Sequence, residues 1–203
     1  MGSFDVRLDD ERTQFDAFVE EYRVAIEAAL DGLTEEQARR RLVPSATTLL
    51  GLLKHVTWMQ RVWFEECVGG TSRRELGLVQ GPDESFRLSG DDTVASVTAA
   101  HREACATARA VVADLSLDAV VTGHRAGPRT LRWVYLQVLR ELAHHCGHAD
   151  IPGNSFAGPK HLVHMRGAPQ LIERSATAKN EALARRLWDV SEQLTGVRSP
   201  LAA

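Results

Sequence analysis

The residues best suited to chemistry lie close together near position 145. Within eight residues the chain carries one glutamate and three histidines, namely Glu141, His144, His145 and His148. Carboxylate and imidazole groups are side chains that bind zinc and similar divalent ions. A divalent-metal site is therefore the first hypothesis for this stretch. The simpler alternative is that these are ordinary core or surface histidines.

The sequence around these residues predicts a single helix. Residues 131–150 are rich in strong helix formers, and no proline interrupts them. At about 100° per residue, Glu141, His145 and His148 fall within roughly 60° of arc and form a column over two turns. Ligands at positions i and i+4 of one helix can clasp an ion only if another element supplies further ligands.

Helical periodicity also ranks the adjacent histidines. The apolar face of the predicted helix is defined by Leu131, Val134, Val138, Leu142 and Ala149. His145 lies about 30° from the middle of that face and His144 about 130° from it. We therefore expect His145 to point into the protein and His144 toward the surface, with His148 at the rim. Cys146 points away from the column, about 100° from His145.

A second histidine-bearing helix is predicted over residues 45–68, with Ser45 as its N-cap. His55 lies in this helix at the margin of the inward face. A buried histidine needs a polar partner, and that partner could be a metal, a carbonyl or a carboxylate.

The chain as a whole predicts an all-α fold. Long helices are expected over residues 9–30, 45–68, 91–115 and 131–150, with a short helix after the capping-box sequence at 34–37. Four long helices of similar length indicate an antiparallel four-helix bundle. The glycine-rich loop 70–90 is long enough to cover a site.

Residues 1–150 are expected to form this bundle and residues 151–203 a C-terminal extension packed on it. Pro152 and Gly153 end the preceding helix. An irregular stretch is expected next, followed by a last helix over residues 175–194.

Composition narrows the classes of function. The net charge of −3 argues against nucleic acid as a partner. No apolar run of 18 residues and no signal-peptide core are present, which predicts no membrane span and a cytoplasmic location. An odd count of three cysteines without a CxxC pair favours a reducing compartment over a disulfide framework.

Two blocks of the sequence resemble the DinB superfamily. They are PSATTLLGLLKHVTWMQRVWF at residues 44–64 and LRWVYLQVLRELAHHCGHAD at residues 131–150. The resemblance implies an up-down-down-up four-helix bundle with one divalent metal, zinc or nickel. It also implies one ligand from the second helix, matching His55. A pair four residues apart on the last helix matches Glu141 and His145.

His148 takes a position held by glutamine in many relatives. It is a candidate fourth ligand, a group that orients a ligand, or a catalytic proton carrier. After Asp150 the sequence departs from the family pattern, because relatives continue the helix where Pro152 and Gly153 break it here.

The resemblance implies an enzyme in which a metal activates a thiolate or water for thiol transfer or thiol-dependent isomerisation. The related mycothiol-dependent maleylpyruvate isomerases suggest mycothiol as co-substrate, beside a small-molecule substrate. One alternative is a non-catalytic, stress-linked metal or small-ligand binding protein, favoured if four protein ligands saturate the ion. Another is a helical interaction module. A homodimer is compatible with each of these.

Overall fold

The computed structural model describes residues 2–41, 47–150, 156–161 and 166–172, and most of this part of the chain is helical. The helical elements are α1 (Glu11–Ala28), α2 (Glu35–Arg39), α3 (Leu49–Gln60), η1 (Arg61–Val68), α4 (Pro82–Ser85), α5 (Val94–Val112) and α6 (Leu131–Ala149). The strands are β1 (Val120–Val121), β2 (Arg129–Thr130), β3 (Phe156–His161) and β4 (Arg166–Ile172). The predicted all-α class is confirmed at this level, with two short antiparallel hairpins added.

Side-chain caps explain where the helices begin. Asp10 accepts a hydrogen bond from the backbone of Thr13 at the start of α1. The predicted capping box of α2 is present, because Thr34 and Gln37 each accept from the other's backbone N–H. Thr93 and Thr130 cap α5 and α6 in a similar way. These caps satisfy N–H groups that the first helical turn cannot pair internally.

The second long helix begins later than predicted. Ser45 lies outside the described residues, and the observed cap is Thr48, whose side chain accepts from the backbone N–H of Gly51 at 2.9 Å. From Arg61 onward the helix widens into the π-helix η1. Gly69 and Gly70 follow its end, as the sequence predicts.

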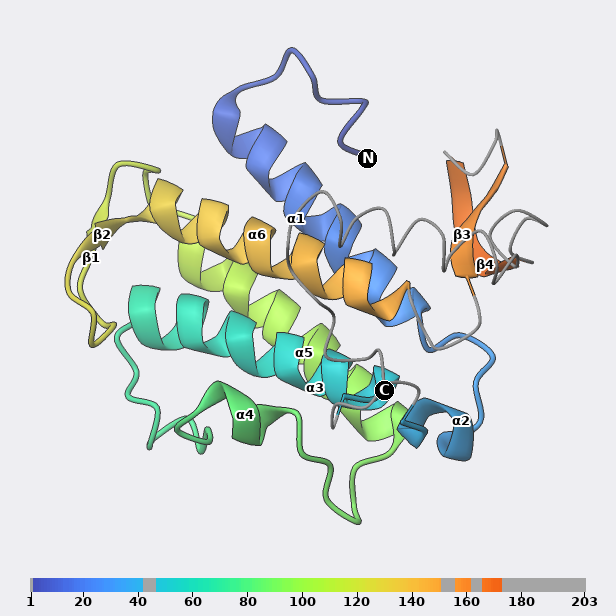
Figure 1. Ribbon diagram of the computed structural model, residues 1–203. Helices are drawn as coiled ribbons and strands as arrows, with labels where there is room; N and C mark the ends of the chain where they lie inside the picture. The colour runs from blue at the N-terminus through green and yellow to red at the C-terminus, as the bar shows by residue number, and fades with distance from the viewer. Residues whose placement is uncertain (1, 42–46, 151–155, 162–165, 173–203) are drawn as a thin grey trace, which may run out of the picture.

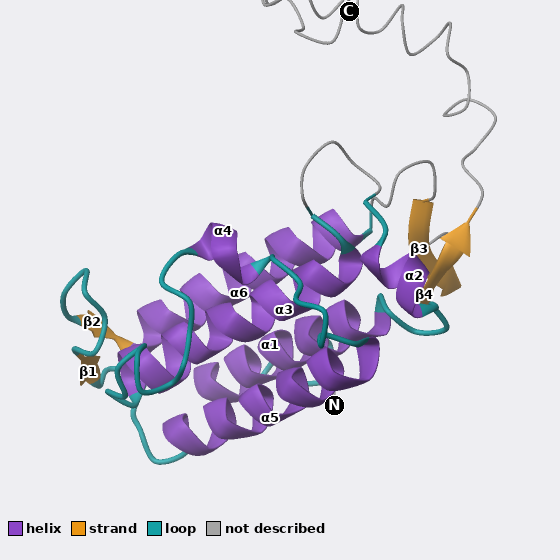
Figure 2. Ribbon diagram, turned by 90° about the horizontal axis from the view of Figure 1, so that it is seen from below, coloured by secondary structure: helices purple, strands orange, loops and turns teal. Residues whose placement is uncertain are grey.

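The helical body consists of α1, α3 with its continuation η1, α5 and α6, which lie side by side (Figure 1). Helix α1 packs against α6, α3 packs against both α5 and α6, and η1 packs against α5 and α6. Helices α1 and α6 run in one direction, and α3 and α5 run in the other (Figure 1). The short α4 lies beside α3, and the two hairpins lie at opposite ends of the helical body (Figures 1 and 2).

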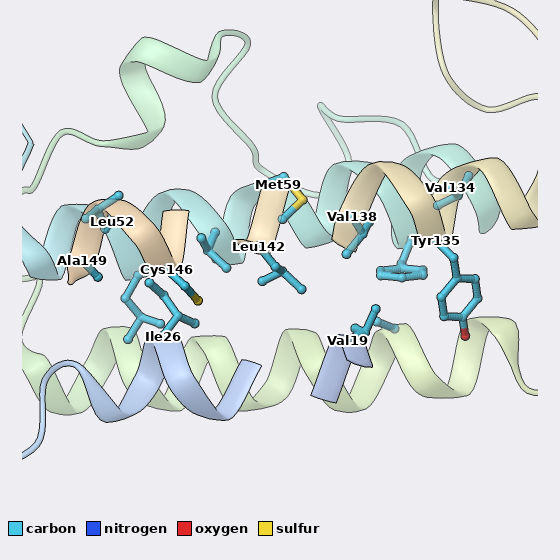
Figure 3. Packing of buried hydrophobic residues seen from close by; sticks show 14 of the residues in the cluster. Val19, Ile26, Leu52, Met59, Val134, Tyr135, Val138, Leu142, Cys146 and Ala149 are labelled. Atoms are coloured by element: carbon cyan, nitrogen blue, oxygen red, sulfur yellow. The ribbon is translucent and has the colours of Figure 1, made fainter. Parts of the chain in front are cut away.

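The core lies between these helices. Figure 3 shows side chains from α1, α3 and α6 packed together, including Val19, Ile26, Leu52, Met59, Val134, Tyr135, Val138, Leu142, Cys146 and Ala149. This confirms the predicted apolar face of α6, which fixes the direction in which its histidines point. In the described part of the chain, no helix combines the length and apolar character of a membrane span.

The stretch after residue 155 differs from expectation. Residues 156–172 were expected to be irregular, yet β3 and β4 form an antiparallel pair with a shift in register between Pro159 and His161. Prolines at 159 and 169 hide the strand pattern in the sequence. Both strands are edge strands, where proline is better tolerated than in a central strand, and Pro159 lies opposite Pro169 in the register. The helix expected over 175–194 lies outside the described residues.

Candidate metal site

Helices α3 and α6 bring His55 and His145 together, although 90 positions separate them in the sequence. His55 is 4% exposed and His145 is 7% exposed. Their ring centroids are 4.5 Å apart and the rings meet edge to face, at 68°. His145 points inward and His144 is exposed, as the helical periodicity of residues 131–150 predicts.

Glu141 lies one turn before His145 on α6. Its Oε2 is 3.6 Å from Nε2 of His145. Its Oε1 accepts hydrogen bonds from Gln137 Nε2 at 2.9 Å and from the guanidinium of Arg140 at 3.0 Å. These two donors hold one carboxylate oxygen, and the other oxygen faces the imidazole.

His148 is not drawn into this pair. It is exposed, with its ring 5.5 Å from that of His145 and only 4.2 Å from that of the exposed His144. The predicted column on α6 is therefore split by burial. His145 is buried and Glu141 is half-buried, whereas His148 lies at the surface.

The polar partner of His55 is a hydroxyl, which the sequence did not indicate. His55 Nδ1 lies 2.6 Å from Oγ of Ser85, the last residue of α4. Phe86 stacks on the imidazole at a centroid distance of 3.9 Å and an angle of 9°. Pro82 and the acidic residues after it indicate a helix start, but no sequence pattern links α4 to a histidine 30 residues earlier.

Both buried imidazoles are neutral near pH 7. Burial, followed by repulsion from His145, lowers the pKa of His55 to about 3. Burial also lowers the pKa of His145, although the Glu141 carboxylate opposes this. Neutral imidazole is the form that binds metals, because its unprotonated nitrogen supplies the lone pair.

The donor chemistry at this place fits a divalent ion such as zinc. Two neutral imidazoles lie beside a carboxylate, and His145 Nδ1 is buried without a hydrogen-bond partner among the described residues. The donors are not a preformed ligand set, however. In the part of the chain that the structure describes, no group of three or more His, Cys, Asp and Glu side chains is arranged to hold an ion.

Two cavities flank the segment that follows α4. One, of about 820 Å³, lies between α3, α5 and the 77–92 segment and reaches Trp58 and Ser85. The other, of about 690 Å³, includes Phe86 and three arginines, Arg39, Arg41 and Arg87. Neither cavity is lined by His55 or His145 directly. Each reaches the histidine pair through one intervening residue, Ser85 or Phe86.

The chain's own thiols are buried elsewhere in the helical body. Cys67, Cys105 and Cys146 are all unpaired and buried. Burial raises the pKa of each thiol, that of Cys146 to about 12. Each thiol is therefore protonated near pH 7 and is a poor nucleophile.

Comparison with known families places the chain in one of them. The family model for mycothiol-S-transferases matches residues 14–155, which span α1 to α6 and include both histidine-bearing helices. The chain belongs to the mycothiol-S-transferase family. This family is DinB-like, so the resemblance to the DinB superfamily is confirmed. Among curated proteins, none matches the chain.

The match to the mycothiol-S-transferase family ends near the point where the sequence departs from the DinB pattern. Residues 156–203, which hold β3 and β4, lie beyond the matched region. His55, Glu141, His145 and His148 all lie within it.

Proposed function

We propose that the protein is a mycothiol S-transferase, which joins the sulfur of mycothiol to an electrophilic small molecule. The observation that carries the proposal is the pair of buried, neutral imidazoles, His55 and His145, with the Glu141 carboxylate beside them. Membership of the mycothiol-S-transferase family supports mycothiol as the thiol. The two imidazoles and the carboxylate are suited to hold a metal ion that activates this thiol.

The proposed metal ligands are His55, Glu141 and His145, with His148 as a candidate fourth ligand. Zinc fits this set of two imidazoles and one carboxylate, and nickel is the alternative. When bound, such an ion lowers the pKa of a thiol, so that the thiolate is available near pH 7. The exposure of His148 supports three protein ligands rather than four, which favours an enzyme over a closed binding site.

His148 is proposed to carry the proton in the reaction. Its imidazole is exposed beside His144 and can exchange protons with solvent. A nitrogen of His148 takes the proton from the mycothiol thiol, and the sulfur lone pair forms a bond to the electrophilic carbon. The leaving group departs with the electrons of its bond to that carbon.

The attacking sulfur comes from the co-substrate and not from the protein. All three cysteines are buried with a raised pKa, so none presents a thiolate at the site. The cavities on either side of residues 86–88 provide room for mycothiol and for the electrophile. A low-molecular-weight thiol needs a reducing compartment, which supports a cytoplasmic location.

The domain arrangement belongs to the same proposal. Residues 1–150 are taken as a DinB-like antiparallel four-helix bundle that carries the site. Residues 151–203 are taken as an extension packed on it and ending in a helix. The packing of α1, α3, α5 and α6 supports the first part.

The test is direct measurement of thioether formation by mass spectrometry. Zinc-loaded and nickel-loaded protein would be incubated with mycothiol and an activated halide, and compared with the protein-free reaction. Losing the bound ion removes several kcal/mol of transition-state stabilisation. We therefore expect His145→Ala to lower the rate of thioether formation at least about 100-fold. His144→Ala should remain within about threefold of wild type, because its side chain is outside the buried pair. A wild-type rate equal to the protein-free rate would refute the proposal.

A further inference from the structure

Ser85 forms two short contacts that together define the state of His55. Its Oγ donates to the backbone carbonyl of Pro82 at 2.5 Å and lies 2.6 Å from Nδ1 of His55. Ser85 is 2% exposed and His55 is 4% exposed, so water does not compete strongly for either contact. A buried hydroxyl and a buried imidazole each need a hydrogen-bond partner, and these two contacts provide one for each group.

The proton count at this contact allows only one arrangement. A serine hydroxyl carries a single proton, and here that proton is directed to the Pro82 carbonyl. Directing it to His55 instead would leave two oxygen lone pairs facing each other at 2.5 Å. The hydroxyl oxygen must therefore accept a hydrogen bond from His55, which places the imidazole proton on Nδ1.

We propose that Ser85 is a positioning residue that fixes His55 as its Nδ1–H tautomer and leaves the lone pair on Nε2 free for a ligand. The tautomer itself follows from the geometry alone. Its use in metal binding rests on the function proposed above. A histidine ligand is commonly oriented by a hydrogen bond to its other ring nitrogen, and Ser85 supplies that bond here.

The surroundings hold this arrangement in place. Phe86 stacks on one face of the imidazole at a centroid distance of 3.9 Å. Two consecutive residues therefore contact the ring, Ser85 at its edge and Phe86 at its face. Gly51 lies one turn before His55 and allows this approach. A Cβ atom at position 51 would lie 2.8 Å from the Phe86 carbonyl oxygen. The fold thus brings α4 close to α3 at the turn that carries His55.

The same proton logic applies to a histidine outside the site. Thr57 Oγ1 donates to the Leu53 carbonyl at 2.8 Å and lies 3.2 Å from Nδ1 of His101. The hydroxyl must again accept, so His101 is also the Nδ1–H tautomer. Its Nε2 lies 3.5 Å from Sγ of Cys105, which also lies 3.8 Å from Oε1 of Gln60. His101 serves as an internal reference for the experiment on His55.

Nitrogen-15 NMR of the metal-free protein tests the tautomer without requiring activity. At pH 7 we expect His55 to show a protonated Nδ1 and an unprotonated Nε2. Ser85→Ala should shift His55 toward a mixture of tautomers and leave His101 unchanged. Ser85→Thr keeps the hydroxyl and should retain the wild-type pattern. If wild-type His55 carries its proton on Nε2, the inference is wrong, whatever the variants do.

Zinc titration of the same proteins tests the consequence. Removing a group that orients a ligand costs about 10- to 100-fold in metal affinity, so we expect Ser85→Ala to bind zinc that much more weakly. An unchanged zinc affinity in folded Ser85→Ala would overturn the positioning role. An Nδ1–H tautomer in a wild-type protein that binds neither zinc nor nickel would support the tautomer and refute the metal site. The two proposals therefore fail separately.

Discussion

Burial gives residues of the same type different chemical properties in this protein. His144 and His145 are neighbours in the sequence, but only His145 lies against α3, where it meets His55. Desolvation keeps both buried imidazoles neutral, which suits them to bind a metal. The three cysteines are also buried, and desolvation keeps them as thiols. Desolvation thus keeps these histidines in the neutral form that binds metals, and it keeps the cysteines in the thiol form, which is a poor nucleophile.

His101 gives a prediction about stability and pH that is independent of the metal site. Its pKa is lowered to about 4, mainly by burial, whereas Glu27 raises it and Arg23 lowers it further. Between pH 6.5 and 4 the unfolded chain binds a proton at this residue that the folded protein does not. The free energy of unfolding must therefore fall as the pH falls through this window.

We expect His101 to account for about 2 kcal/mol of this loss between pH 6.5 and pH 5. Urea unfolding of metal-free protein at the two pH values measures it. His101→Gln should lose less stability than wild type over the same interval, by about that amount. Equal losses in both proteins would show that His101 is protonated in the folded state at pH 5.

At the scale of elements, the site depends on how closely α4 approaches α3. The contact lies at Gly51, where any side chain would meet the Phe86 carbonyl at 2.8 Å and Thr48 Oγ1 at 2.9 Å. Because Ser85 and Phe86 are the residues that hold His55, a displacement of α4 alters a candidate ligand directly.

Gly51→Ala should therefore destabilise the protein by about 1–3 kcal/mol, the usual cost of overpacking, and weaken zinc binding. Gly147→Ala on α6 is the matched control, because a Cβ there meets nothing within 4 Å. Alanine is the better helix former, so this control should stabilise the protein by about 0.5–1 kcal/mol. Chemical unfolding and zinc titration measure both effects. A Gly51→Ala protein as stable as wild type would show that α4 can move without cost.

The elements also show what could be predicted from the sequence. Helical periodicity predicted the long helices and the burial of His145, because both depend on neighbours three and four positions away. The cap of α2 was predictable for the same reason. The contact between Ser85 and His55 was not predictable, because 30 positions separate the two residues and they meet only after the intervening loop has folded back. The strands β3 and β4 were missed because each contains one glycine and one proline, residues that are depleted in strands.

At the scale of the whole molecule, the site lies where two pairs of helices meet. Helix α6 packs on α1 and on α3, and α3 packs on α5, so the His55–His145 contact joins the two halves of the helical body. The segment after α4 covers this contact from outside and forms walls of both cavities. A ligand bound in either cavity would touch residues that touch His55.

The most direct test of the account is isothermal titration of the metal-free protein with zinc. We expect one zinc ion per chain in the wild type and in His144→Ala, whose altered side chain is exposed. Binding should be lost in His55→Ala and His145→Ala, provided that both variants unfold cooperatively like wild type. Equal binding by His55→Ala and wild type, or no zinc or nickel binding by the wild type, would contradict the proposed metal site.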